Sequence, residues 1–156
     1  SKEWGIDPKW FDHHDIHIHF PDGATPKDGP SAGIATGLVI LSAITGVAIK
    51  NDVAMTGEID LRGNSLPIGG LREKTLAALR QGVKTVFVPK DNDRDVLELP
   101  EPVLKGLNIV EVSTLKDVIS QAMVEDPATI KDKILKRTQW VEKSKDKKEA
   151  KTKKEA

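Results

Sequence analysis

The sequence predicts an α/β (mixed α and β) domain in which helices pack on a sheet, and three observations support this class. Short apolar stretches rich in β-branched residues alternate along the chain with segments of helical length. Clusters of proline and glycine separate these segments. The chain has 156 residues and no cysteine, which suits one domain and excludes disulfides, thiolate nucleophiles and cysteine-based metal sites.

The first elements are a strand, a loop and a long helix. Asp15–Phe20 alternates between polar and apolar residues, so we expect a strand with its three apolar side chains on the buried face. Residues 21–30 hold three prolines and two glycines, which indicates a loop. The apolar segment 31–44 is expected to form a helix that ends near Gly46.

The remaining elements continue the alternation of strands and helices, because apolar runs of strand length are followed by segments with helical periodicity. In chain order we expect a strand at 53–61, a turn-rich connection at 64–70, a helix at 71–81 closed by Gly82, a strand at 85–88, a charged excursion with a helical turn at 89–102, a strand at 108–112 and a helix that opens at 113–117 and runs to 124.

Charge is unevenly distributed, although 24 basic residues balance 24 acidic ones. Residues 131–156 hold eleven basic and five acidic side chains, which leaves residues 1–130 with a net charge of −6. An acidic body argues against direct nucleic-acid binding. We therefore expect a domain at 1–124 and a Lys-rich, disordered or partly helical tail at 125–156. A tail that binds nucleic acid or a membrane surface is the alternative.

Membrane insertion is a further alternative, because residues 32–49 contain no charged side chain. The small and polar residues within this segment and the absence of a flanking basic cluster favour a buried core helix instead. Residues 1–11 have no apolar run of the kind found in signal peptides. We expect a cytoplasmic protein.

Two histidines and one glycine-rich segment suggest chemistry that we weigh against simpler interpretations. His17 and His19 share one face of the expected strand and could bind a metal with Asp28 or Glu58, but a solvated polar face is the favoured interpretation. The segment 69–75 lacks the glycine that a phosphate-binding loop places before its lysine. We expect no ATP hydrolysis by this chain.

Ser31 follows the proline-rich loop and precedes the apolar helix. Its hydroxyl could simply cap the helix by accepting a hydrogen bond from the N–H of Gly33 or Ile34. The same position suits a nucleophile, because unpaired N–H groups at a helix start can stabilise an oxyanion. Such a serine needs a base, for which a histidine or a lysine is available.

Lys74 is the lysine with the most informative position. A helical wheel from residue 71 places it beside Ala77 and Ala78, at the flank of the inner face. A lysine that enters an apolar site is desolvated, and such lysines act as neutral bases. A surface lysine whose stem covers apolar neighbours is the alternative.

Three segments, HIHFPDGATPKDGPSAG, DVAMTGEIDLRGNSLPIGGLREK and KTVFVPKDN, resemble the proteolytic domain of the ATP-dependent Lon protease family. The resemblance runs in order from about Gly5 to Met123. It implies that Ser31 is the nucleophile and Lys74 the general base of a Ser–Lys dyad.

The resemblance also implies supporting roles. Thr56 would help to hold the lysine amine, and Asp28 would belong to the active-site loop. His17 and His19 would be polar residues nearby. No metal or cofactor is implied for this chain.

The fold implied is the Lon proteolytic domain, N-terminally truncated. The strands that usually begin it are expected to be missing upstream, so the sheet of domain 1–124 is expected to be incomplete. The family's ATPase module also lies outside this chain, and ATP is expected only there.

The function implied is that of a serine endopeptidase. It would degrade unfolded or damaged proteins as part of a hexameric ring with an AAA+ ATPase module. Neither a membrane nor direct nucleic-acid binding is expected. A Lon-like protease without its own ATPase is a variant of this hypothesis, and a catalytically silent fragment that serves as an assembly or interaction module is the rival.

Overall fold

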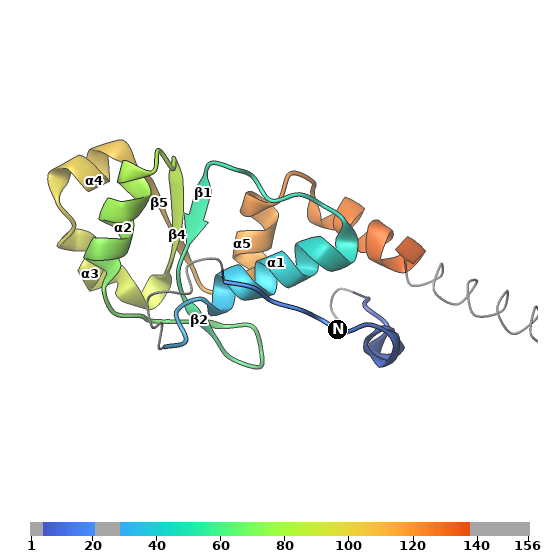
Figure 1. Ribbon diagram of the computed structural model, residues 1–156. Coiled ribbons are helices and arrows are strands. Elements are labelled where there is room, and N and C mark those ends of the chain that lie inside the picture. The colour runs from blue at the N-terminus through green and yellow to red at the C-terminus, as the bar shows by residue number, and fades with distance from the viewer. Residues whose placement is uncertain (1–4, 21–28, 138–156) are drawn as a thin grey trace, which may run out of the picture.

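A computed structural model of the chain describes residues 5–20 and 29–137 and confirms the α/β class. Strands and helices alternate along most of it, as Figure 1 shows. The elements are η1 (Pro8–His13), α1 (Gly33–Thr45), β1 (Val53–Met55), β2 (Glu58–Ile59), β3 (Ser65–Leu66), α2 (Leu71–Arg80), β4 (Thr85–Pro89), η2 (Lys90–Asn92), α3 (Asp93–Leu97), α4 (Glu101–Gly106), β5 (Asn108–Val112) and α5 (Leu115–Ala122). A further helix occupies 127–137. Among these described elements, no helix combines the length and apolarity needed to cross a membrane.

The central sheet has three parallel strands in the order β1-β4-β5. β4 is apolar along its length because helices cover both faces of the sheet. Helices α2, α3 and α4 lie on one side and α1 and α5 on the other (Figure 1). The side chains of β4 alternate between two cores. Val86 and Val88 face the core on the side of α2, α3 and α4, and Phe87 faces the core on the side of α1 and α5.

The prediction of one strand at 53–61 is wrong in one respect, because the strand is broken at Thr56 and Gly57. β1 ends at Met55, and Gly57 has a φ of +154°, which only glycine adopts readily. β2 then leaves the central sheet and pairs antiparallel with β3, which lies in the connection expected to be a turn. The break directs the chain across the start of α1.

The prediction of a strand at Asp15–Phe20 is also wrong, because these residues have no regular secondary structure. Its three apolar side chains are 44–54% exposed instead of buried: Ile16, Ile18 and Phe20. An alternating segment becomes a strand only where a neighbouring strand accepts its backbone hydrogen bonds. Within the described ranges this segment instead runs beside α1, where it lines a depression with Val39.

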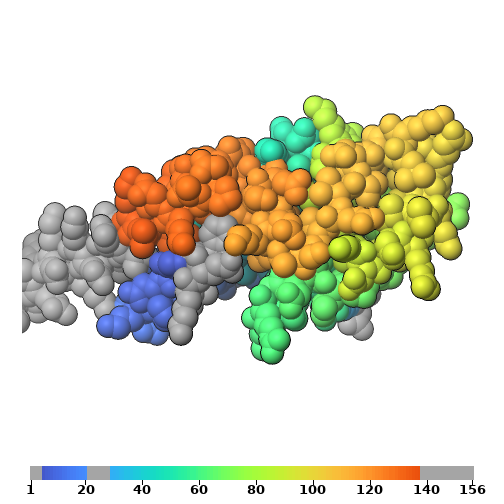
Figure 2. Space-filling model, turned by 180° about the vertical axis from the view of Figure 1, so that it is seen from behind, coloured from blue at the N-terminus to red at the C-terminus, as the bar shows by residue number. Residues whose placement is uncertain are grey.

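The folded body extends past residue 124, where the sequence pattern ends the domain. Ile130 and Ile134 of helix 127–137 are fully buried in the core formed by α1 and α5. Seen from behind, α5 and this helix form one continuous orange surface (Figure 2). Arg137 donates hydrogen bonds from Nη1 to the carbonyls of Ala43 and Ile44 at the end of α1, at 3.1 and 2.7 Å. Residues 138–156 of the expected tail lie outside the described residues.

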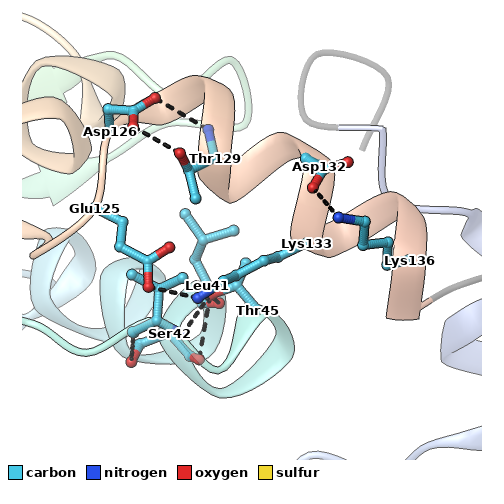
Figure 3. A network of polar contacts seen from close by, with 10 residues as sticks. Leu41, Ser42, Thr45, Glu125, Asp126, Thr129, Asp132, Lys133 and Lys136 are labelled. Carbon is cyan, nitrogen blue, oxygen red and sulfur yellow. Dashed lines mark hydrogen bonds and ion pairs between the residues drawn. The ribbon is translucent and has the colours of Figure 1, made fainter.

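Polar contacts hold the start of this helix. Glu125 pairs with Lys133 at 2.5 Å, and Figure 3 shows this pair where the helix passes α1. Asp126 accepts hydrogen bonds from the N–H and the hydroxyl of Thr129, at 3.0 and 2.6 Å. These bonds hold the pKa of the Asp126 carboxyl below its ordinary value.

Replacing Ile134 by alanine should destabilise the whole domain. Deleting a fully buried isoleucine side chain leaves a cavity, and the expected loss of unfolding free energy is about 2–5 kcal/mol. Lys136→Ala is the matched control, because its side chain is 71% exposed and should contribute about 0.5 kcal/mol or less. Urea unfolding followed by circular dichroism measures both. Equal effects of the two changes would show that the helix does not stabilise the core.

Candidate active site

The structure excludes the simple capping role considered for Ser31. The N-cap of α1 is Ala32, and no side chain caps the helix. The N–H groups that a Ser31 cap would bind are engaged elsewhere: Gly33 donates to the Pro30 carbonyl and Ile34 to the Gly57 carbonyl. Within the described ranges nothing hydrogen-bonds the Ser31 hydroxyl. The interpretation as a helix cap is therefore wrong, and the hydroxyl is available for other partners.

The backbone of Ser31 is nevertheless firmly held. Its carbonyl accepts a hydrogen bond from the Gly57 N–H at 2.9 Å and another from the Thr56 hydroxyl at 3.4 Å. The approach is close because Gly33 has no side chain: a Cβ there would lie 2.9 Å from the backbone nitrogen of Ile59. The break after β1 thus fixes the position of Ser31 relative to the carboxyl end of a parallel strand, where binding sites of such sheets commonly lie.

Lys74 lies in the first turn of α2, as the helical pattern predicts. The helix begins after Gly70, whose φ of +71° permits a sharp entry. The Lys74 Nζ atom donates a hydrogen bond to the Gly69 carbonyl at 2.9 Å. The lysine stem is therefore folded back over the start of its own helix.

Ser31 and Lys74 line the same pocket, which has a volume of about 240 Å³. Its remaining walls are apolar except for Thr56: Ala32, Ala35, Ala54, Met55, Thr56, Ala78 and Val86. The backbone N–H groups of Ala32 and Ala35 donate to no acceptor among the residues that the structure describes. Ser31, Lys74 and two residues whose N–H groups have no described acceptor therefore line one small, mostly apolar cavity. These are the parts needed for nucleophilic attack on a carbonyl.

Comparison with known proteins shows the family of this chain. A family model described as the Lon protease (S16) C-terminal proteolytic domain matches residues 1–125. The chain belongs to the Lon protease family. The match ends before helix 127–137, which the structure places in the same folded body as the Lon domain.

Lon proteases of several bacteria resemble this chain. It is 58% identical over 123 residues to that of Azospirillum brasilense, 52% over 128 residues to that of Brucella abortus (strain 2308), and 50% over 127 residues to that of Brevibacillus choshinensis. These alignments cover 79%, 82% and 81% of the chain but only 15–16% of each relative. The chain therefore spans about a sixth of the length of the Lon proteases it matches.

The supporting residues implied by the Lon resemblance differ in their position relative to the pocket. Thr56 lines the pocket and is buried, but its hydroxyl donates to the Ser31 carbonyl. The contact expected between Thr56 and the Lys74 amine is not among the hydrogen bonds of the described residues, where the amine binds Gly69. In this Lon domain the threonine thus acts on the serine backbone.

The histidines do not join the pocket. His17 and His19 are exposed and line the depression beside α1, while Ser31 and Lys74 line a different cavity. Glu58 lies in β2 and does not line the pocket either. The described residues contain no group of three side chains placed to hold a metal ion. Asp28 lies outside the described residues, as does most of the loop before Ser31.

Sequence reasoning missed two contributors to the site. The Gly69 carbonyl holds the Lys74 amine, and Gly57 contacts the start of α1 with both its N–H and its C=O. The sequence held a signal for the Gly69 carbonyl, because two successive glycines directly before a helix indicate a sharp turn and an exposed carbonyl. The second had no clear signal, since the alternating pattern through residue 57 is equally that of an unbroken strand.

Proposed function

We propose that this chain is a serine endopeptidase with a Ser31–Lys74 dyad, and that it forms the proteolytic part of an ATP-dependent Lon-type protease. The observation that carries the proposal is that one apolar pocket is lined by both side chains, with the Ser31 hydroxyl free of any described partner. Membership of the Lon family supports the peptidase class.

The reaction begins with proton transfer. The neutral Lys74 amine takes the Ser31 hydroxyl proton while Oγ forms a bond to the peptide carbonyl carbon. The carbonyl oxygen becomes an oxyanion, and its proposed donors are the N–H groups of Ala32 and Ala35, which bind no acceptor among residues 5–20 and 29–137. Their position at the start of α1 adds the positive end of the helix dipole.

Collapse of this intermediate completes the first half of the reaction. The Lys74 ammonium gives its proton to the leaving nitrogen as the C–N bond breaks, which leaves an ester on Ser31. Water then attacks the ester, with Lys74 again as the base, and releases the second product. The acid, base and nucleophile that the protein supplies all belong to this chain, and no cofactor takes part.

The wider context is proposed from the family. Unfolded or damaged proteins in the cytoplasm are the substrates, and a hexameric ring with an AAA+ ATPase module is the assembly. ATP acts in that module. The absence of a long apolar helix from the described residues is compatible with this setting.

Labelling with a fluorophosphonate tests the proposal. The reagent should form one covalent adduct, mapped by mass spectrometry to Ser31, and the full chain should cleave an unfolded polypeptide. Ser31→Ala should lose both. Ser42→Ala is the matched control, since this serine of α1 donates its hydroxyl to the Val47 carbonyl and should not react.

Two outcomes contradict the proposal. An adduct that persists in the Ser31→Ala variant would place the nucleophile elsewhere. A wild-type chain that neither forms an adduct nor cleaves polypeptide would favour the silent fragment, whose role is assembly or interaction.

A further inference from the structure

Asn92 is a buried amide that binds the backbone before α2. It ends η2, directly after β4, and is 2% exposed. Its Oδ1 atom accepts a hydrogen bond from the Ile68 N–H at 3.0 Å, and its Nδ2 atom donates to the Ile68 carbonyl at 2.8 Å. One side chain therefore satisfies both backbone groups of one residue, as a neighbouring strand would.

Ile68 directly precedes the two glycines that lead to the lysine. Gly69 has open space where a side chain would be, and the φ of Gly70 is +71°. Glycines impose little restriction on backbone direction. The orientation of the Gly69 carbonyl is therefore set by its two anchored ends, which are the Asn92 clamp on Ile68 and the first turn of α2.

That carbonyl is the hydrogen-bond partner of the Lys74 amine, at 2.9 Å. A neutral amine that donates one N–H to a carbonyl keeps its lone pair free and pointing elsewhere. The flexible lysine stem would otherwise sample many rotamers. Fixing one N–H thus restricts the directions in which the amine can accept a proton.

We infer that Asn92 is a positioning residue for the catalytic base: it clamps Ile68, the clamp fixes the Gly69 carbonyl, and the carbonyl orients the Lys74 amine. The inference rests on the proposed dyad. It assigns a role to Asn92 of the PKDN segment, which lies 18 residues beyond Lys74 in sequence and binds the residue before the two glycines that precede α2. α3, which follows η2, lies beside α2 in Figure 1.

A purely structural role is the rival explanation, because Asn92 also donates to the Asp95 carboxylate and precedes α3. Two controls separate the roles. Asp95→Ala removes only that contact and leaves the Ile68 clamp intact. Val103→Ala truncates a fully buried side chain in the same core and lowers stability without removing a hydrogen bond of residues 68–74.

The kinetic test compares these three variants in the full chain. Asn92→Ala should lower kcat for polypeptide cleavage about tenfold or more, because small displacements of a catalytic group have large effects on rate. Its KM should stay within about twofold of the wild type, since Asn92 does not line the pocket. Both control variants should keep kcat within about twofold at a temperature where all the proteins are folded.

A second readout does not require activity. Competitive acetylation with acetic anhydride, read by mass spectrometry, gives the reactivity of Lys74 relative to that of Lys9. Asn92→Ala should raise this ratio at least threefold, because the amine loses its fixed acceptor, and the controls should leave it unchanged. Equal kcat and equal Lys74 reactivity in Asn92→Ala and Val103→Ala would overturn the inference.

The two proposals can fail separately. If cleavage survives Ser31→Ala, the dyad is wrong, and the acetylation ratio still tests whether Asn92 controls the lysine. If Ser31→Ala is inactive while Asn92→Ala matches its controls in both measurements, the dyad stands and the positioning role fails.

Discussion

Replacing Lys74 by alanine should lower kcat for polypeptide cleavage by about a hundred- to ten-thousandfold, the contribution of a well-placed general base. Lys74→Arg should not restore it, because a guanidinium stays protonated and cannot accept the serine proton. Lys84→Ala is the matched control, since this lysine is 77% exposed and pairs with Asp52 at the surface. Steady-state kinetics and the rate of fluorophosphonate labelling measure the effect.

The histidines provide an independent test of the base. With lysine as the base, the His17→Ala variant should keep substantial activity. Loss of fluorophosphonate labelling in His17→Ala, together with residual activity in the Lys74→Ala variant, would instead assign the base to a histidine. The positions of His17 and His19 in a separate depression argue against that outcome.

Gly57→Ala should impair folding and catalysis together. A Cβ atom at this position would lie 2.3 Å from Cδ1 of Ile34, a fully buried side chain of α1. The φ of +154° is also unfavourable for alanine. Overpacking and backbone strain each cost about 1–3 kcal/mol, so we expect a loss of about 2–6 kcal/mol in unfolding free energy. Cleavage should fall as well, because the shifted backbone holds the Ser31 carbonyl.

Gly63→Ala is the control for the strain alone. Its φ is +87°, but nothing lies within 4 Å of the added Cβ atom. We expect this change to lower the unfolding free energy through backbone strain alone, by about 1–2 kcal/mol, and to leave kcat unchanged. Urea unfolding and steady-state kinetics compare the two variants. If Gly57→Ala and Gly63→Ala lose the same stability and keep the same kcat, the contact between Gly57 and α1 is not critical.

The sequence was a good guide where local pattern and final packing agree. β4 and β5 are confirmed: the apolar residues of β4 are buried, and those of β5 are buried or half-buried. The helix closed by Gly82 is confirmed within one residue. The helical wheel also placed Lys74 beside Ala78, which lines the same pocket. These features depend on periodicity over a single element, which a sequence shows directly.

Features that depend on distant partners could not be predicted in this way. The alternation of Asp15–Phe20 is that of a strand, yet the hydrogen bonds of a strand come from another part of the chain. Ile130 and Ile134 are four residues apart, which suits one face of a helix, but their charged neighbours suggested a solvated segment. The partner of the Lys74 amine is a backbone carbonyl, and the composition of a sequence does not show how a carbonyl points.

The hydrogen bond between Arg137 and the end of α1 links residues that are 93 positions apart, and this separation has a consequence during protein synthesis. A ribosome adds about 5–20 residues per second, so α1 emerges roughly 5–20 s before the arginine and the two isoleucines that complete its core. Until then, the apolar side of α1, the helix that follows Ser31, is not covered by Ile130 and Ile134. The start of α1, which follows Ser31, should therefore become rigid only after residue 137 has left the ribosome.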